Sequence, residues 1–378
     1  MKKADVSRDY YMLKGPLATH GYDWWWHSFT AYHKKTGEAK AFFIEYFICN
    51  PALGEEKPVL GQLPENQEKK KKPSYAMIKV GTWGKDAKQI HNFYPISAFY
   101  SYENKLEICI EDNYLTERRL KGHCKVTSEE AKAHPEYMCD AGEIIFDLHM
   151  EKKIAYQVGY GASKPFRTID AFEMYWNAQG IKTLFSGSVI FDGEEYEVIP
   201  EKSYGYSDKN WGADFTSPWL WLSSCKLTST LTNKELSNSA IEFGGGQPNV
   251  FGHALSRKLL GGFYYEGKLY DYNFSKFWQK SDVKFSFTEG EVYNTWKVRA
   301  ENRNSRLDMI VKCRKDEMLF INYEAPNGKK LHNRLWNGGT GKGKIRIYDK
   351  QKEFYILVDE IKMENVGCEY GEYDTDLR

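Results

Sequence analysis

The chain has 378 residues, of which 41% are hydrophobic and 28% charged, a balance typical of a globular protein with a sizeable core. Its 53 Lys and Arg residues against 52 Asp and Glu residues give a formal net charge of +1, which provides no overall field for nucleic acid or an anionic membrane. The aromatic share of 16% is high, and aromatic residues favour strands and also line apolar pockets.

Other sequence-wide features argue against several classes of protein. The seven cysteines are scattered without a CxxC pair, which favours reduced thiols in a cytoplasmic protein over a disulfide framework. We expect no signal peptide and no membrane span, because the N-terminus lacks an apolar core and no 18-residue apolar run occurs. No HExxH, GxSxG or phosphate-loop motif is present, so we expect neither a metal nor another cofactor. The oligomeric state stays open.

Strand-like runs dominate in chain order. They are short and rich in β-branched or aromatic residues, turn signals such as FDGE separate many of them, and they occupy 41–50, 75–83, 105–112, 182–191, 195–199, 344–349 and 353–361. Thr127 and Glu130 form a capping pattern that predicts a short helix, which His134-Pro135 ends. The pattern predicts an all-β chain of sandwich or barrel type, with one half over 1–200 and the other over 201–378.

The segment 51–74 contains four prolines and four consecutive lysines. Prolines and like charges bury little surface, so this segment is predicted to be a solvated, mobile loop, with 55–73 among the most mobile parts of the chain. A docking site for an acidic partner is the alternative interpretation.

The stretch SYGYSDKNWGADFTSPWLWL at 203–222 places a charged cluster inside the most aromatic part of the chain. If it is extended, Tyr206, Asp208 and Asn210 share one face, whereas Lys209 and Trp211 take the other. Aromatic walls would desolvate Asp208 and raise its pKa, so that it could protonate an olefin or a carbonyl group. The alternative is a carboxylate that caps a turn or pairs with Lys209. Trp211 is a candidate pocket wall or a core residue.

Further candidates lie in aromatic strands. In YDWWWHSF the alternation places Trp25 and His27 on one face, where an indole could stabilise a cation and an imidazole could act as a base. Glu45 in FFIEYF and Glu173 in FEMYW, which shares a face with Tyr175, are carboxylates in apolar strands and need a partner or a wet cavity. For each of these residues, packing in a barrel core is the competing interpretation.

These blocks resemble, in order and over nearly the whole chain, the tocopherol cyclase-like family. The most specific block is Tyr-x-(Asp/Glu)-Lys-Asn-Trp-Gly, here YSDKNWG at 206–212; the others include 21–29, 42–51, 92–115, 172–198, 243–248, 261–273, 325–347 and 366–373. The resemblance implies two lipocalin-like β domains that pack together and form an apolar cavity at their junction. One departure is Asp208, since tocopherol cyclases usually have Glu there.

Residues and resemblance together predict a cofactor-independent enzyme of the cyclase (isomerase) or hydratase (lyase) type, acting on a hydrophobic small molecule. Asp208 would protonate a double bond or an enone, and Tyr206 and Asn210 would orient the Asp208 carboxyl group. A phenol, a hydroxyl or water would then add to the protonated group. The enzyme could also catalyse the reverse elimination. The predicted substrate contacts are Trp25, His27, Glu45, Glu173, Tyr175 and Trp211. The alternative is a non-catalytic lipocalin-like carrier of a hydrophobic ligand.

Overall fold

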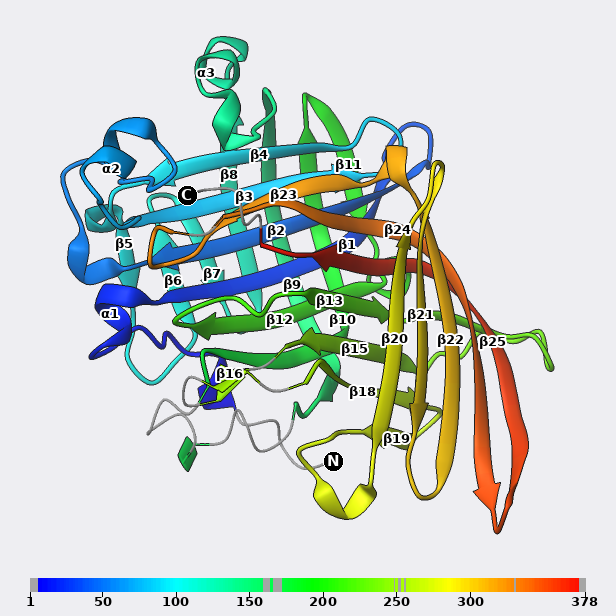
Figure 1. Ribbon diagram of the computed structural model, residues 1–378. Coiled ribbons are helices and arrows are strands. Elements are labelled where there is room, and N and C mark those ends of the chain that lie inside the picture. The colour runs from blue at the N-terminus through cyan, green and yellow to red at the C-terminus, as the bar shows by residue number, and fades with distance from the viewer. Residues whose placement is uncertain are drawn as a thin grey trace.

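The computed structural model describes residues 6–158, 164–165, 172–247, 249–250, 253–254, 256–329 and 331–373. A twelve-stranded and an eleven-stranded antiparallel sheet, with one separate two-stranded pair, form almost all of this structure (Figure 1). In the first sheet most neighbours are consecutive in the chain, the up-and-down pattern of lipocalin-like barrels, whereas in the second sheet β13 pairs with β25 and β15 with β18. The all-β prediction is therefore confirmed.

The first sheet curls back on itself. Asn92 in β4 donates to the carbonyl of Lys125 in β8 at 2.9 Å and accepts its N–H at 3.0 Å. The strands of this sheet are β1 Tyr22–His33, β2 Ala39–Cys49, β3 Tyr75–Trp83, β4 Lys88–Tyr94, β5 Phe99–Ser101, β6 Glu107–Ile110, β7 Asn113–Thr116, β8 Arg119–Val126, β9 Gly142–Tyr156, β10 Met174–Phe191, β11 Glu194–Val198 and β12 Gly205–Gly212.

The second sheet is more open, and β20, β21 and β22 run down one side of the molecule together with the hairpin ends of β24 and β25 (Figure 1). Its strands are β13 Trp219–Ser224, β14 Lys226–Ser229, β15 Ala240–Gly246, β18 Lys258–Tyr265, β19 Lys268–Tyr272, β20 Asp282–Glu289, β21 Tyr293–Glu301, β22 Ser305–Arg314, β23 Leu319–Glu324, β24 Leu331–Gln351 and β25 Phe354–Gly371. The separate pair is β16 Asn249–Val250 and β17 His253–Ala254.

Helices are short. The α-helices are α1 Leu17–His20, α2 Pro64–Glu68 and α3 Ser128–Ala133, and the 3-10 turns are Val6–Asp9, Pro51–Leu53, Ile96–Ala98, Pro135–Tyr137, Pro200–Lys202, Phe277–Gln279 and Lys315–Glu317. The predicted cap of α3 is confirmed, since Thr127 and Glu130 exchange the two hydrogen bonds of a capping box. None of the helices in the described parts of the chain is long and apolar enough to cross a membrane.

The first sheet continues past the expected boundary at residue 200. Strand β12 pairs with both β1 and β10, so the first sheet ends at Gly212 and the second begins at Trp219. The pairing of β12 with β1 and β10 keeps the residues after 200 in the first sheet, although the composition near 200 resembles a loop. The chain passes from the first sheet to the second within 213–218. The division into two domains stays a prediction.

Alternation along β1 divides the aromatic core. Trp25 points into the core of the first sheet, whereas Trp24 and Trp26 point into a separate aromatic core that lies between the two sheets. Trp176 of the first sheet and Trp219 of the second belong to this shared core. The two sheets therefore meet through indole rings, and the candidate site lies here.

The segment 51–74 is less solvated than its composition predicts. Leu60 is buried, and the carboxylate of Glu324 accepts the backbone N–H groups of Gly61 (3.1 Å) and Gln62 (2.5 Å). A buried glutamate in the second sheet thus holds the segment at Gly61 and Gln62. The local composition could not reveal this contact, because Glu324 is distant in the sequence. The mobility of the remainder stays a prediction.

Candidate active site

Strand β12 carries the charged cluster along the junction. As the alternation predicts, Tyr206, Asp208 and Asn210 share one face, and all three are buried. Trp26 lies directly opposite Asp208, and Trp24 directly opposite Asn210, on the neighbouring strand β1. The carboxyl and amide groups therefore face the indole-rich layer between the sheets.

Asp208 accepts two hydrogen bonds on one carboxyl oxygen. Its Oδ2 lies 2.7 Å from Nε1 of Trp176 and 2.9 Å from the hydroxyl of Tyr206, whereas Oδ1 has no hydrogen-bond partner within the described residues. Burial raises the pKa of Asp208 to about 7, although the two donated hydrogen bonds oppose this rise. Near neutral pH this group can both hold and release a proton, as a general acid or base requires.

The alternative of an ion pair between Asp208 and its sequence neighbour Lys209 is wrong. Lys209 is on the opposite face of β12, where it pairs with the buried carboxylate of Asp23. Its Nζ also lies 4.1 Å from the centre of the Trp25 ring and 5.1 Å from that of Trp211. The lysine is therefore neutralised on the far side of the strand and does not lower the pKa of Asp208.

Tyr206 connects Asp208 to a second buried carboxyl group. Its hydroxyl lies 3.0 Å from Oε1 of Glu242 in β15, and Trp221 Nε1 donates to that same oxygen at 2.8 Å. Burial raises the pKa of Glu242 well above its usual value. Because the single hydroxyl proton of Tyr206 can serve only one carboxylate at a time, the three groups form a chain along which a proton can be shared. Glu242 was not among the residues predicted from the sequence, although a glutamate within the apolar run IEFGGG indicates a buried carboxyl group.

Two more carboxyl groups are buried in the same layer. Glu45 accepts a hydrogen bond from Tyr323 at 3.0 Å and lies 3.5 Å from Nζ of Lys79. Burial raises the pKa of Glu45, and the positive charge of Lys79 partly offsets this rise. Glu369 accepts from Trp219 at 2.6 Å and from Asn337, and burial together with Asp208 raises its pKa to about 8. Burying several acids together is costly, and such groups cluster at functional sites.

An apolar cavity of about 120 Å³ lies beside this layer, between β10 of the first sheet and β13, β15 and β18 of the second. An apolar cavity at the junction is thus confirmed. Trp176 and Trp221 form part of its wall, while their Nε1 atoms donate to Asp208 and Glu242. Gly244 makes room for this wall, because a Cβ atom there would lie 2.8 Å from the Trp176 ring.

The predicted catalytic residues do not line this cavity directly. Tyr206, Asp208 and Asn210 are absent from its lining, because the indoles of Trp176 and Trp221 stand between the cavity and the carboxyl groups. The cavity is also smaller than the roughly 300 Å³ at which drug-sized ligand pockets begin. A sizeable ligand would therefore have to displace an indole, and would then reach Asp208.

Three of the predicted substrate contacts lie on the far side of the strands from Asp208. Trp25 donates to the carbonyl of Asp9 at 2.8 Å, and Trp211 stacks on Tyr175. His27 lies 3.0 Å from the hydroxyl of Ser207, and burial lowers its pKa to about 3, so its imidazole is neutral. The structure does not bring these three to the carboxyl layer, because odd-numbered residues of β1 and β12 point into the first sheet.

The other predicted contacts have three different positions. Tyr175 lines the cavity, and Glu45 joins the carboxyl layer. Glu173 lies just before β10, where its backbone carbonyl accepts the N–H groups of Ala213 and Asp214. Within the described residues, no group of three or more His, Cys, Asp or Glu side chains is arranged to hold a metal ion.

The fold and the site define an all-β protein with buried carboxyl groups and an apolar cavity between two curved sheets. The family model for tocopherol cyclase-like proteins matches residues 153–372, and the chain belongs to this family. It is 29% identical over 154 residues to the chloroplastic probable tocopherol cyclase of Oryza sativa subsp. japonica, and 28% identical over 154 residues to the chloroplastic tocopherol cyclase of Zea mays. Each match covers 40% of this chain but only 28% of the relative. A crystal structure of CghA with Sch210972 is 11% identical, with a TM-score of 0.43, and the match covers 94% of this chain and 89% of CghA.

Proposed function

We propose that this protein is a cofactor-independent enzyme of the cyclase or hydratase type, in which Asp208 is the proton donor to an apolar substrate. The observation that carries the proposal is the buried carboxyl group of Asp208. One of its oxygens is held by Trp176 and Tyr206, and the other has no protein partner within the described residues. A carboxyl group whose pKa lies near 7 can hold its proton at neutral pH and deliver it. Membership of the tocopherol cyclase-like family supports cyclase chemistry.

The proposed reaction begins when Asp208 transfers its proton to one carbon of a double bond, which leaves a cation on the other carbon. The oxygen of a phenol, an alcohol or water then bonds to that carbon, and its proton returns to Asp208. An internal hydroxyl gives a ring without change of composition, whereas water gives a hydrated product. The faces of Trp24 and Trp26, which lie on the same side of the sheet as Asp208, would stabilise the cation.

Neighbouring residues would assist in distinct ways. Asn210 is fully buried, and neither its amide nitrogen nor its amide oxygen has a hydrogen-bond partner within the described residues, so it can bind the hydroxyl that adds. Tyr206 would hold the Asp208 carboxyl in place, and Glu242 would return a proton through it. Movement of the Trp176 indole would join the apolar cavity to Asp208, with the substrate taking the place of the lost hydrogen bond.

A non-catalytic carrier of a hydrophobic ligand is the second candidate. The position of Asp208 behind Trp176, outside the cavity lining, favours it. A carrier needs only the apolar wall, so its affinity should not depend on whether residue 208 can donate a proton.

Deuterium labelling separates the two functions. Hydrophobic compounds that co-purify with the protein would be identified by mass spectrometry, and then incubated with fresh protein in deuterium oxide beside a prenylated phenol as a probe substrate. An enzyme of the proposed type fixes one deuterium on carbon per turnover, and Asp208→Asn should lower the rate about 10²-fold or more. A carrier returns the compound unlabelled.

Glu324→Gln serves as the matched control, since Glu324 is also buried with a pKa of about 7 but binds the backbone of Gly61 and Gln62. This variant should keep its turnover. Normal labelling by Asp208→Asn would refute the assignment of the proton donor.

A further inference from the structure

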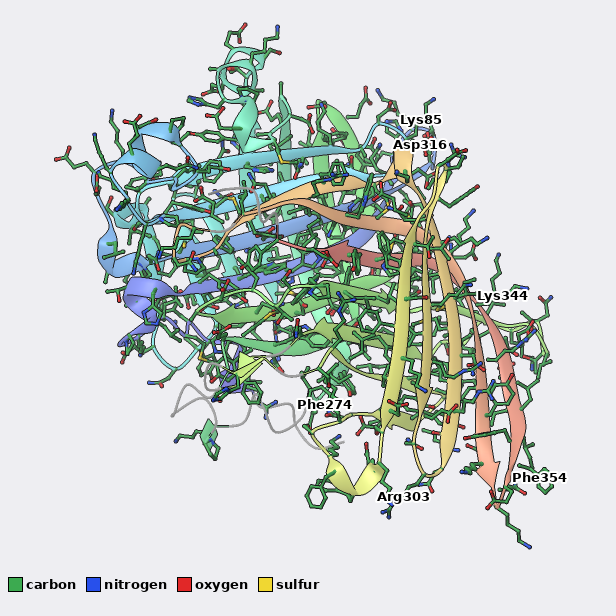
Figure 2. All side chains as sticks on the ribbon, in the orientation of Figure 1. Lys85, Phe274, Arg303, Asp316, Lys344 and Phe354 are labelled. Atoms are coloured by element: carbon green, nitrogen blue, oxygen red, sulfur yellow. The ribbon has the colours of Figure 1, made fainter. Side chains whose placement is uncertain are left out.

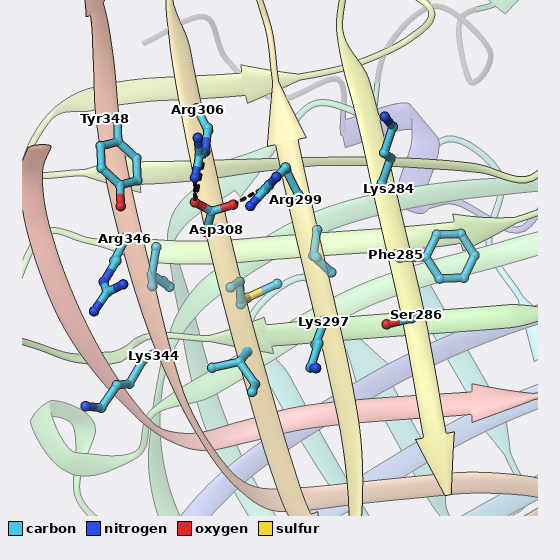
Figure 3. A pocket seen from close by; sticks show the side chains of 14 residues that line it. Lys284, Phe285, Ser286, Lys297, Arg299, Arg306, Asp308, Lys344, Arg346 and Tyr348 are labelled. Atoms are coloured by element: carbon cyan, nitrogen blue, oxygen red, sulfur yellow. Dashed lines mark hydrogen bonds and ion pairs between the residues drawn. The ribbon is translucent and has the colours of Figure 1, made fainter. Parts of the chain in front are cut away.

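The near-zero net charge of the chain conceals a surface on the second sheet where cations outnumber acids. Asp308, Glu360 and Asp282 pair with four of its cations, and the other four are lysines without an ion pair within the described residues. Positively charged side chains gather on the outer face of β20, β21, β22 and β24, and several surround a concavity of about 690 Å³ (Figure 3). We call this surface the basic face; its cations are Lys284, Lys297, Arg299, Arg306, Lys312, Lys342, Lys344 and Arg346. At its centre Asp308 is bound by both Arg299 (2.7 Å) and Arg306 (2.9 Å).

The strand register places like charges directly opposite each other on this face. Lys312 lies across from Lys342, and Lys344 across from Lys362. Like charges in such cross-strand positions repel, so Lys312 and Lys342 work against the stability of the sheet, whereas Glu364, 3.3 Å from Nζ of Lys362, offsets the repulsion at the second pair. Within the described residues, Lys297, Lys312, Lys342 and Lys344 form no ion pair, and all four are exposed. An anionic partner would relieve the repulsion.

Apolar side chains border the lower end of the basic face. The β24–β25 hairpin extends beyond the neighbouring strands, and Phe354 at its tip is 75% exposed (Figure 2). Leu357 on the same hairpin is also exposed, while Tyr348 and Tyr355 pack against Arg306, with ring centres 5.1 and 5.4 Å from its guanidinium carbon. Cations beside exposed apolar side chains match the two attractions of an anionic lipid surface, which are charged headgroups and an apolar interior.

We propose that the basic face docks the protein on membranes that contain anionic lipid, with the tip of the β24–β25 hairpin inserted among the headgroups. An acidic protein or nucleic acid would satisfy the lysines but would leave Phe354 exposed. Docking of this kind does not depend on the chemistry at Asp208, which lies in the other sheet. It would give an apolar substrate a short path from the bilayer to the protein.

Co-sedimentation with lipid vesicles tests the proposal. The full chain should bind phosphatidylcholine vesicles that contain phosphatidylglycerol, should bind pure phosphatidylcholine weakly, and should be released by high salt. Each neutralised lysine should lower partition about fivefold, so Lys312→Gln with Lys344→Gln should lower it about 25-fold. Phe354→Ser should weaken binding to both kinds of vesicle.

The matched control is Lys35→Gln with Lys121→Gln, which removes the same charge from exposed positions in the β1–β2 turn and in β8 and should leave binding unchanged. The variant of the basic face should melt at the same or a higher temperature, because it removes like-charge repulsion. Equal loss of binding in both double variants, or no preference for phosphatidylglycerol, would overturn the proposal.

Discussion

Replacing Asp208 with Asn should change how the stability of the protein depends on pH. Burial raises the pKa of this carboxyl from 3.8 to about 7, a shift worth about 4 kcal/mol. Because the folded state holds the proton more tightly than the unfolded state, the contribution of Asp208 to stability is fully present below pH 3.8 and is lost as the pH rises through 7. Asn keeps the size of the side chain but does not ionise, so the variant escapes this loss.

The magnitude can be measured by urea unfolding of both proteins at several pH values. The parent should lose about 3 kcal/mol of its roughly 4 kcal/mol Asp208 contribution between pH 5 and pH 8, because the rest is lost below pH 5. The unfolding free energy of the variant should therefore rise by about 3 kcal/mol relative to the parent over this range. Comparing the two proteins at each pH cancels the titration of Glu324, whose pKa is raised by burial and not by Asp208. A constant difference across this range would show that Asp208 is not held in a desolvated site, and the case for it as a proton donor would fail.

Three further predictions concern the surroundings of the site. Gly244→Ala should displace the Trp176 ring and lower the unfolding free energy by about 1–3 kcal/mol. The displacement should change the tryptophan fluorescence. An unchanged spectrum and an unchanged stability would show that the Trp176 ring does not pack against Gly244. Glu324→Ala should free Gly61 and Gln62 and speed tryptic cleavage at the lysines of 69–72, whereas cleavage at other loops should keep its rate. Glu369→Gln should stabilise the protein above pH 8 relative to the parent, since the parent then ionises a buried acid whose pKa is about 8; equal stability of both proteins at pH 9 in urea unfolding would contradict this.

Much of the architecture and part of the site could be predicted from local pattern. Alternation in YSDKNWG determined that Tyr206, Asp208 and Asn210 would share a face, because neighbouring residues of any strand point to opposite sides. The aromatic surroundings of Asp208 also predicted a raised pKa, since desolvation follows from burial among rings.

Tertiary structure alone decided which strands bring their faces together. Alternation within β1 separated Trp25 from Trp24 and Trp26, but only the pairing of β1 with β12 shows that Trp26, and not Trp25, lies beside Asp208. Glu242 reaches Tyr206 from another sheet, so no local spacing could have joined them. The lysines of the basic face are scattered over several strands, and their repulsion exists only in the register of the folded sheet. Local sequence sets which side of a strand a residue takes, whereas contact between strands depends on burial summed over the whole chain.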